Sequence, residues 1–234
     1  MKVLLVLPPN IGRYIVATIP HAGMAYLAAV LEKGGHEVAF QDMRIYPDDN
    51  NLFKKIIDFK PDLIGFSTAS FGYKLSYSII DKIKERFNMP LAVGGSYVSI
   101  VFSKILEETK ADYVVYGEGE QTFLEIANKV PLKDIRGLIW RNNGEIITNP
   151  PYPAIKNLDE LPNAVRVPEI LSRSNNWNLA FPAPDRQTGV AQINTTRGCP
   201  YTCSFCVSPV LWASGETRSK RITFRSSGKV VSEI

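Results

Sequence analysis

Short apolar runs alternate with amphipathic stretches from the first residues to about Lys129 of this 234-residue chain. The runs Val3–Leu7 and Leu63–Phe66 are too short for core helices and suit strands that are covered on both faces. Between such runs, apolar residues recur at helical spacing, as from Met24 to Leu31. This alternation predicts strand–helix units around a buried parallel sheet, which is a doubly wound, Rossmann-like α/β fold.

The same patterns place the individual elements. We expect strands at Val3–Leu7, Glu37–Gln41, Leu63–Phe66, Pro90–Val93 and Tyr113–Tyr116. We expect helices over Met24–Leu31, Leu52–Phe59, Leu75–Phe87, Val101–Glu107 and Phe123–Ala127. Asn142-Asn143-Gly144 then predicts a tight turn between Gly137–Trp140 and Glu145–Thr148, because Asn-Gly supplies the positive φ that a hairpin turn needs.

Prolines mark the next part of the chain, from Pro150 to Pro184, and it lacks a clear period. Such a passage is typical of a connector on the surface. After it, Val190–Thr195 predicts a strand that leads into a cysteine-containing loop. We therefore expect a Rossmann-like domain over residues 1–141, a hairpin end and proline-rich linker over 142–188, and a further segment over 189–234.

The three cysteines of the chain, Cys199, Cys203 and Cys206, fall within eight residues in a Cys-x3-Cys-x2-Cys pattern. Three thiolates so close together can each ligate one iron of a [4Fe–4S] cluster, and the fourth iron is then free to bind a small molecule. The pattern therefore indicates a catalytic cluster.

Other roles for the cysteines are less consistent with the sequence. A structural zinc site needs four ligands, and the two histidines, His21 and His36, lie far upstream. A disulfide framework needs an even number of cysteines, whereas an odd number and an otherwise cysteine-free chain fit a reducing compartment. An iron–sulfur or zinc protein that uses the cysteines for structure or electron transfer is kept as an alternative.

With Phe205 directly before Cys206, the motif resembles the signature of the radical S-adenosylmethionine (SAM) superfamily. The resemblance implies that Cys199, Cys203 and Cys206 bind the cluster and that its open iron chelates SAM. In that family an external electron donor reduces the cluster, SAM is cleaved, and a 5′-deoxyadenosyl radical removes a hydrogen atom from a small-molecule substrate. The resemblance also implies that Phe205 lines the adenine side of SAM, and a core aromatic is the alternative.

The loops at the carboxyl ends of the predicted strands are rich in small residues, and ligands of open α/β sheets bind there. These loops are Pro8-Pro9-Asn10-Ile11-Gly12, Ser67-Thr68-Ala69, Gly94-Gly95-Ser96-Tyr97 and Gly117-Glu118-Gly119-Glu120. Small residues let a large ligand approach the backbone, although ordinary turn chemistry explains any one loop.

Together with Pro20-His21-Ala22-Gly23, these loops resemble the cobalamin-binding domain that precedes the radical core in one branch of the superfamily. The resemblance implies that Ser67, Gly94 and Gly95 flank the nucleotide tail of cobalamin. It also places Gly117 and Glu118 at the cofactor site.

Many corrinoid domains carry Asp-x-His-x-x-Gly after the first strand, but here the loop reads Pro9-Asn10-Ile11-Gly12-Arg13-Tyr14. We therefore expect cobalamin to bind with its base off and with no histidine on cobalt. His21 is expected to cap or pack against a helix.

The partial barrel of radical SAM enzymes needs on the order of 150–200 further residues after the cysteine loop, at about 30 residues per strand–helix unit. Only residues 207–234 follow here, and residues 218–234 resemble the approach to the first barrel helix. We therefore expect a truncated chain that does not turn over SAM alone and that lacks the residues that select the substrate.

Charge and composition limit the remaining possibilities. A formal charge of +4 and 45% hydrophobic residues indicate a globular protein. The apolar run Val3–Leu7 ends at Pro8-Pro9, too short for a signal peptide or a membrane span, so we expect a cytoplasmic protein. Nothing in the sequence indicates an oligomeric state.

Basic residues gather after the cysteines, and they could engage an anionic substrate, the SAM carboxylate or nucleic acid, or form a solvated face. They are Arg218, Lys220, Arg221, Arg225 and Lys229. No aromatic platform is interleaved with them, which disfavours nucleic acid.

The sequence supports three hypotheses: the amino-terminal part of a cobalamin-dependent radical SAM methyltransferase or cyclase, a non-catalytic corrinoid-binding module, and the structural metal protein mentioned above. The first accounts for both the glycine-rich loops and the cysteines.

Overall fold

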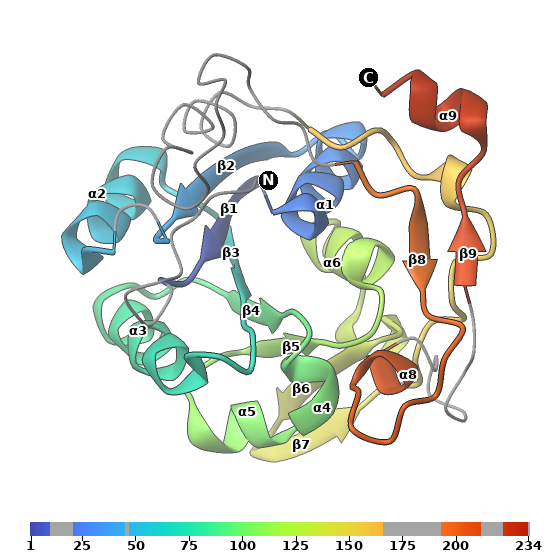
Figure 1. The fold of residues 1–234 in the computed structure, drawn as a ribbon. Coiled ribbons are helices and arrows are strands. Elements are labelled where there is room, and N and C mark those ends of the chain that lie inside the picture. The colour runs from blue at the N-terminus through green and yellow to red at the C-terminus, as the bar shows by residue number, and fades with distance from the viewer. Residues whose placement is uncertain (10–20, 45–46, 166–192, 212–221, 234) are drawn as a thin grey trace, which may run out of the picture.

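The computed structural model describes residues 1–9, 21–44, 47–165, 193–211 and 222–233. A seven-stranded sheet lies at its centre, in the order β2-β1-β3-β4-β5-β6-β7 (Figure 1). The strands are β1 (Lys2–Leu7), β2 (Glu37–Asp42), β3 (Leu63–Ser67), β4 (Leu91–Gly94), β5 (Tyr113–Val115), β6 (Leu138–Asn142) and β7 (Glu145–Thr148). The first five strands are parallel, and β6 and β7 join antiparallel. The predicted doubly wound α/β fold is confirmed.

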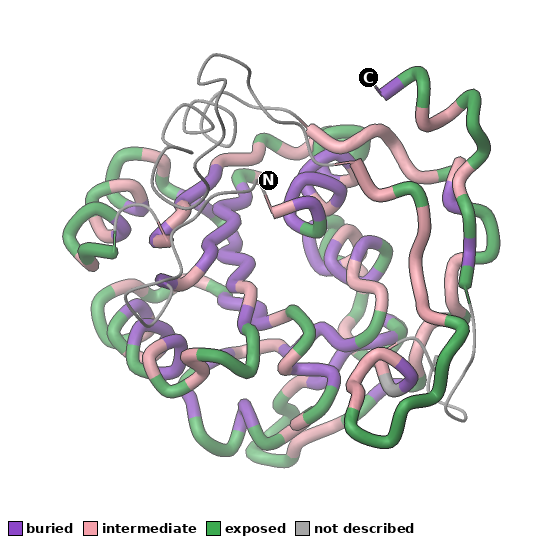
Figure 2. Tube along the Cα trace, in the orientation of Figure 1, coloured by how far each residue is buried: buried purple, intermediate pink, exposed green. Residues whose placement is uncertain are grey.

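Helices cover both faces of this sheet (Figure 1). They are α1 (Ala22–Lys33), α2 (Asp49–Phe59), α3 (Tyr73–Arg86), α4 (Val98–Val101), α5 (Lys104–Glu108) and α6 (Gly119–Ala127), with short 3₁₀ turns at Leu132–Asp134 and Leu158–Glu160. Along β1, Val3 and Leu5 pack with residues of α1 and α6, whereas Leu4 and Val6 pack with residues of α2 and α3. The apolar run of β1 is therefore buried on both sides, as Figure 2 shows for the central strands.

One helix differs from the sequence expectation. The helix predicted over Val101–Glu107 is divided into α4 and α5, because Phe102 between them has a φ of 49° that a continuous helix does not allow. The predicted hairpin is confirmed, with Asn143 and Gly144 at φ of 48° and 89°. The hairpin strand β7 lies at the edge of the seven-stranded sheet, and the domain boundary at residue 141 stays a prediction.

The carboxyl-terminal part contains a small antiparallel pair, β8 (Thr196–Gly198) with β9 (Ile222–Phe224), and the helices α8 (Ser208–Leu211) and α9 (Ser227–Val231). The strand predicted at Val190–Thr195 begins only at Thr196 within the described residues, and residues 190–192 lie outside them. Among the helices that the structure describes, none is both long and apolar enough to cross a membrane.

Candidate functional site

A cavity of about 430 Å³ lies at the carboxyl edge of the sheet. It is lined by the end of β3, by the loops after β4 and β5, by the first turns of α1, and by β8. The lining includes five residues that the sequence assigned to cobalamin: Ser67, Gly94, Gly95, Gly117 and Glu118. The fold therefore brings these residues to one place, although their role in binding the cofactor stays a prediction.

Backbone contacts join the loops that follow β3, β4 and β5. The Thr68 amide donates to the Gly94 carbonyl at 2.8 Å, and the Tyr97 amide donates to the Thr68 carbonyl at 3.3 Å. The Gly117 amide donates to Ser99 Oγ at 3.0 Å, which ties the β5 loop to α4. The three loops therefore form one connected surface.

The two adjacent glycines have different structural roles. Gly95 has a φ of 106°, and a Cβ there would lie 2.5 Å from the Thr68 carbonyl oxygen. A Cβ on Gly94 would make only ordinary contact, 3.6 Å from the Val115 carbonyl oxygen. The resemblance to cobalamin-binding domains places both glycines beside the ligand, but Gly95 is required first by the packing of the β3 and β4 loops.

The cavity has the features that a large ligand with a long tail requires. At Gly117, where φ is 76°, a Cβ would meet no atom within 4 Å, so the backbone is open to a ligand. Thr68, which follows the lining residue Ser67 but does not itself line the cavity, has a buried hydroxyl with no hydrogen-bond partner among the described residues. These observations fit a cobalamin tail at this edge of the sheet.

Arg197 of β8 closes one side of the cavity and was not identified from the sequence. Its guanidinium forms ion pairs with Glu118, at 3.4 Å, and with Glu120, and its Cζ lies 5.6 Å from the centre of the Tyr26 ring. Burial lowers the pKa of Arg197, but the carboxylates of Glu120 and Glu118 more than offset this and hold the pKa above its usual value. Glu118 also accepts a hydrogen bond from the Ile155 amide at 2.6 Å.

His21 caps helix α1, as the sequence predicted. Its Nδ1 accepts a hydrogen bond from the Met24 amide at 3.2 Å. Burial and the positive charge of Arg44 lower the pKa of His21, while Asp42 acts in the opposite direction. The ring also lines the cavity, but one of its nitrogens is used in the cap.

The cysteine loop follows directly after β8. Cys199, Cys203 and Cys206 are all free thiols. The Ser208 amide lies 3.5 Å from Cys206 Sγ, and hydrogen bonding from Ser208 lowers the pKa of that thiol. The donor set therefore has the chemistry that an iron–sulfur cluster requires, but no three His, Cys, Asp or Glu side chains of the described segments converge to hold a metal ion.

Phe205 is 92% exposed, so the alternative of a core aromatic is wrong. It is not among the residues that line the cavity, and its contact with the adenine of SAM stays a prediction.

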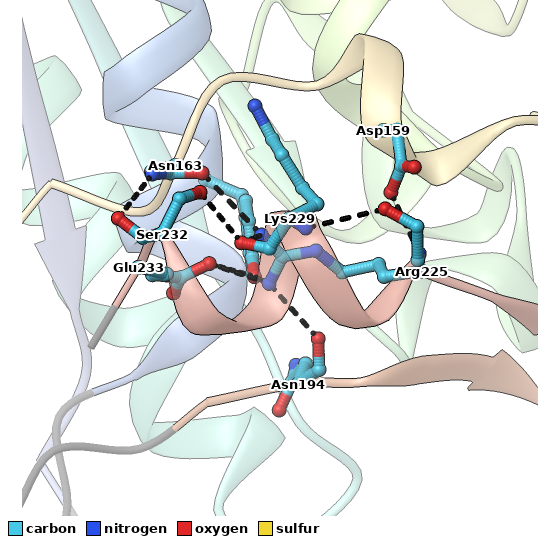
Figure 3. Close-up of polar contacts among 9 residues, drawn as sticks. Asp159, Asn163, Asn194, Arg225, Lys229, Ser232 and Glu233 are labelled. Atoms are coloured by element: carbon cyan, nitrogen blue, oxygen red, sulfur yellow. Dashed lines mark hydrogen bonds and ion pairs between the residues drawn. The ribbon is translucent and has the colours of Figure 1, made fainter.

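Arg225 does not belong to a solvated basic face, because it is buried in a polar network at the end of the chain (Figure 3). Its side chain is 4% exposed and pairs with Glu233, which is 1% exposed. It also donates to the Tyr26 hydroxyl at 2.8 Å and to the Asn194 carbonyl at 3.2 Å. Arg218, Lys220 and Arg221 lie outside the described residues.

Comparison with known proteins identifies the domain. The family model of the B12 binding domain matches residues 11–127, half of the chain. The uncharacterized methyltransferase PH0819 of Pyrococcus horikoshii is 31% identical over 100% of this chain and 50% of its own length. The anaerobic magnesium-protoporphyrin IX monomethyl ester cyclase of Rubrivivax gelatinosus is 29% identical over 95% of this chain and 40% of its own.

A solved structure shows the same fold. The cobalamin-dependent SAM radical enzyme OxsB, with aqua-cobalamin and SAM bound, superposes with a TM-score of 0.75 at 22% identity, over 99% of this chain and 31% of that one. The chain thus spans half or less of the length of these relatives. Since the family model covers half of its residues and agrees with the fold and the cavity, the chain belongs to the B12-binding domain family.

Proposed function

We propose that this chain supplies the cobalamin site and the cluster-binding loop of a cobalamin-dependent radical SAM enzyme, either a methyltransferase or a cyclase. The observation that carries the proposal is the course of β8: Arg197 lines the cavity, and Cys199 follows two residues later. The two cofactor sites implied by the sequence would therefore be neighbours.

The chain's own residues have distinct tasks in this proposal. The loops after β3, β4 and β5 hold the cobalamin tail, and Gly94 and Gly117 leave room beside the backbone. Cys199, Cys203 and Cys206 supply thiolates to a [4Fe–4S] cluster. When bound, these groups together with SAM would provide a radical and, in a methyltransferase, a methyl group for a small-molecule substrate.

Several further assignments belong to the same proposal. An external electron donor would reduce the cluster, and Phe205 would lie on the adenine side of SAM. Three free thiols fit a reducing compartment, so we place the protein in the cytoplasm. We also propose that the cobalamin unit includes the hairpin to Thr148, followed by the linker and the cysteine-containing segment.

One observation favours a second candidate. Because the described cysteines do not converge on a metal position, a corrinoid-binding module without a catalytic cluster would explain the cavity alone. Cluster reconstitution distinguishes the two candidates.

The test uses anaerobic reconstitution of the chain with iron and sulfide, followed by metal analysis and absorption spectroscopy. The proposal predicts about four irons per chain and loss of the cluster in Cys203→Ala. One zinc per chain without iron–sulfur absorption would contradict it. The variant Ser204→Ala, which changes the same loop without removing a thiol, serves as the matched control and should retain the iron.

A further inference from the structure

Arg197 connects the cavity with the beginning of the cysteine loop. Its Nη1 faces Glu118 and its Nη2 faces Glu120, so the two ends of one planar guanidinium are held by two carboxylates. The side chains of Arg197, Glu118 and Glu120 are 12%, 8% and 10% exposed. A rigid fork with both ends paired in a buried site has little freedom to turn. The backbone of residue 197, two positions before Cys199, is therefore fixed to the β5 loop.

Tyr26 of helix α1 provides a second attachment for Arg197. Its ring centre lies 5.6 Å from the Cζ of Arg197 and 5.7 Å from the Cζ of Arg225. Its hydroxyl donates to Glu233 at 3.2 Å and accepts from Arg225 at 2.8 Å. Helix α1, which carries Tyr26, is thus joined to β8 and to Arg225 and Glu233, the residues on either side of α9.

These contacts give the same three residues two roles. Glu118, Glu120 and Tyr26 line the cavity, and they also determine where Arg197 lies. A ligand in the cavity would restrict the movement of all three. Only Gly198 separates Arg197 from Cys199, and Gly198 is held in the β8–β9 ladder opposite Ile222, so a restriction of Arg197 also restricts the start of the cysteine loop.

We propose that Arg197 is a positioning residue that couples occupation of the cavity to the order of the cysteine loop. The inference rests on the proposed function in that the ligand is a corrinoid. Coupling between two sites is reciprocal, so a corrinoid in the cavity orders the loop to the same extent that an ordered loop strengthens corrinoid binding.

The first experiment needs no cofactor. Iodoacetamide alkylation of the reduced chain is followed at each cysteine by mass spectrometry. Arg197→Gln should accelerate alkylation of Cys199 at least about fivefold, which is the lower end of typical coupling between sites. Arg197→Lys keeps the charge but not the planar guanidinium, so its rate of Cys199 alkylation should lie between those of the wild type and Arg197→Gln.

Lys110→Gln is the matched control. It removes the ion pair between Lys110 and Glu85, at 2.6 Å, whose side chains are 55% and 60% exposed. Lys110 lies just before β5, at the amino edge of the sheet and away from the cavity. Alkylation of Cys199 should stay at the wild-type rate in this variant. Equal rates in Arg197→Gln and wild type would overturn the inference.

The second experiment adds cyanocobalamin, whose cobalt already carries a cyanide ligand. Saturating cyanocobalamin should slow alkylation of Cys199 at least about fivefold in the wild type and leave it unchanged in Arg197→Gln. The same protection in both proteins, or no protection in a wild type that binds cyanocobalamin, would overturn the coupling. If the wild type binds no corrinoid, the proposed function fails, whereas the cofactor-free comparison still decides whether Arg197 positions the loop.

Arg197→Gln leaves two buried carboxylates without their cation, and it could fail to fold. The double variant Arg197→Gln/Glu120→Gln avoids this, because it removes opposite charges together and Glu118 keeps the Ile155 amide. A folded double variant with rapid alkylation of Cys199 supports the inference. A folded double variant with the wild-type rate contradicts it.

Discussion

Gly94 and Gly95 are adjacent, yet the structure predicts opposite effects when each is replaced by alanine. At Gly95 the φ of 106° is unfavourable for a side chain, and the new Cβ would lie 2.5 Å and 2.9 Å from the carbonyl oxygen and amide nitrogen of Thr68. Backbone strain costs about 1–3 kcal/mol, and overpacking costs about 1–3 kcal/mol. We therefore expect Gly95→Ala to lower the free energy of unfolding by about 3 kcal/mol.

Gly94→Ala should behave differently, because its Cβ would make only ordinary contact with Val115. Its free energy of unfolding should change by less than about 1 kcal/mol. Gly94 nevertheless lines the cavity, so the added methyl group should weaken cobalamin binding about tenfold, which corresponds to about 1.4 kcal/mol.

Thermal unfolding followed by circular dichroism separates the two variants. For a chain of this size, about 3 kcal/mol lowers Tm by about 6–12 °C, which is expected for Gly95→Ala and not for Gly94→Ala. A cobalamin titration of both variants at a temperature where each is folded completes the comparison. Equal losses of stability, or Gly94→Ala with wild-type cobalamin affinity, would refute the assignment of these glycines.

Two other predictions follow from the caps and ion pairs. His21→Ala removes the cap on the Met24 amide and should cost about 1 kcal/mol without changing the spectrum of bound cobalamin. Because the pKa of His21 is lowered in the folded protein, its contribution to stability is present above a pH of about 6.5 and is lost as the pH falls below that value. Between pH 7 and 5, urea titrations should therefore show a smaller decrease in the free energy of unfolding for His21→Ala than for the wild type. Glu233→Gln leaves Arg225 buried without its carboxylate, a change that costs about 3–5 kcal/mol in comparable pairs, so hydrogen exchange of α9 should accelerate while that of the central sheet stays unchanged.

The sheet and the lining of the cavity could be predicted from the sequence because their signals are local. The apolar run of β1 is continuous since both of its faces are buried, and small residues follow the parallel strands where the cavity forms. The division between α4 and α5 has no such signal. It depends on the conformation of Phe102, whose ring packs 5.3 Å from that of Tyr116.

The contacts of Arg197 could not be predicted for a related reason. They join β8 to Glu118 and Glu120, 79 and 77 residues earlier in the chain, and no periodicity relates the two segments. The useful signal was compositional: two carboxylates in Gly117-Glu118-Gly119-Glu120 and one cation directly before the cysteine motif. Carboxylates in a glycine-rich loop at a sheet edge need a partner if the loop is covered.

Titration of the chain with hydroxocobalamin shows whether the cavity at the carboxyl edge of the sheet holds cobalamin. Absorption spectra are recorded during the titration, and electron paramagnetic resonance spectra are recorded after reduction to Co(II). We expect stoichiometric binding with the base off, no nitrogen hyperfine splitting from an axial histidine, and the same spectra in His21→Ala. Absence of binding by a folded chain would show that the cavity does not hold cobalamin. A histidine-ligated spectrum that disappears in His21→Ala would contradict the expectation that no histidine of the chain binds cobalt.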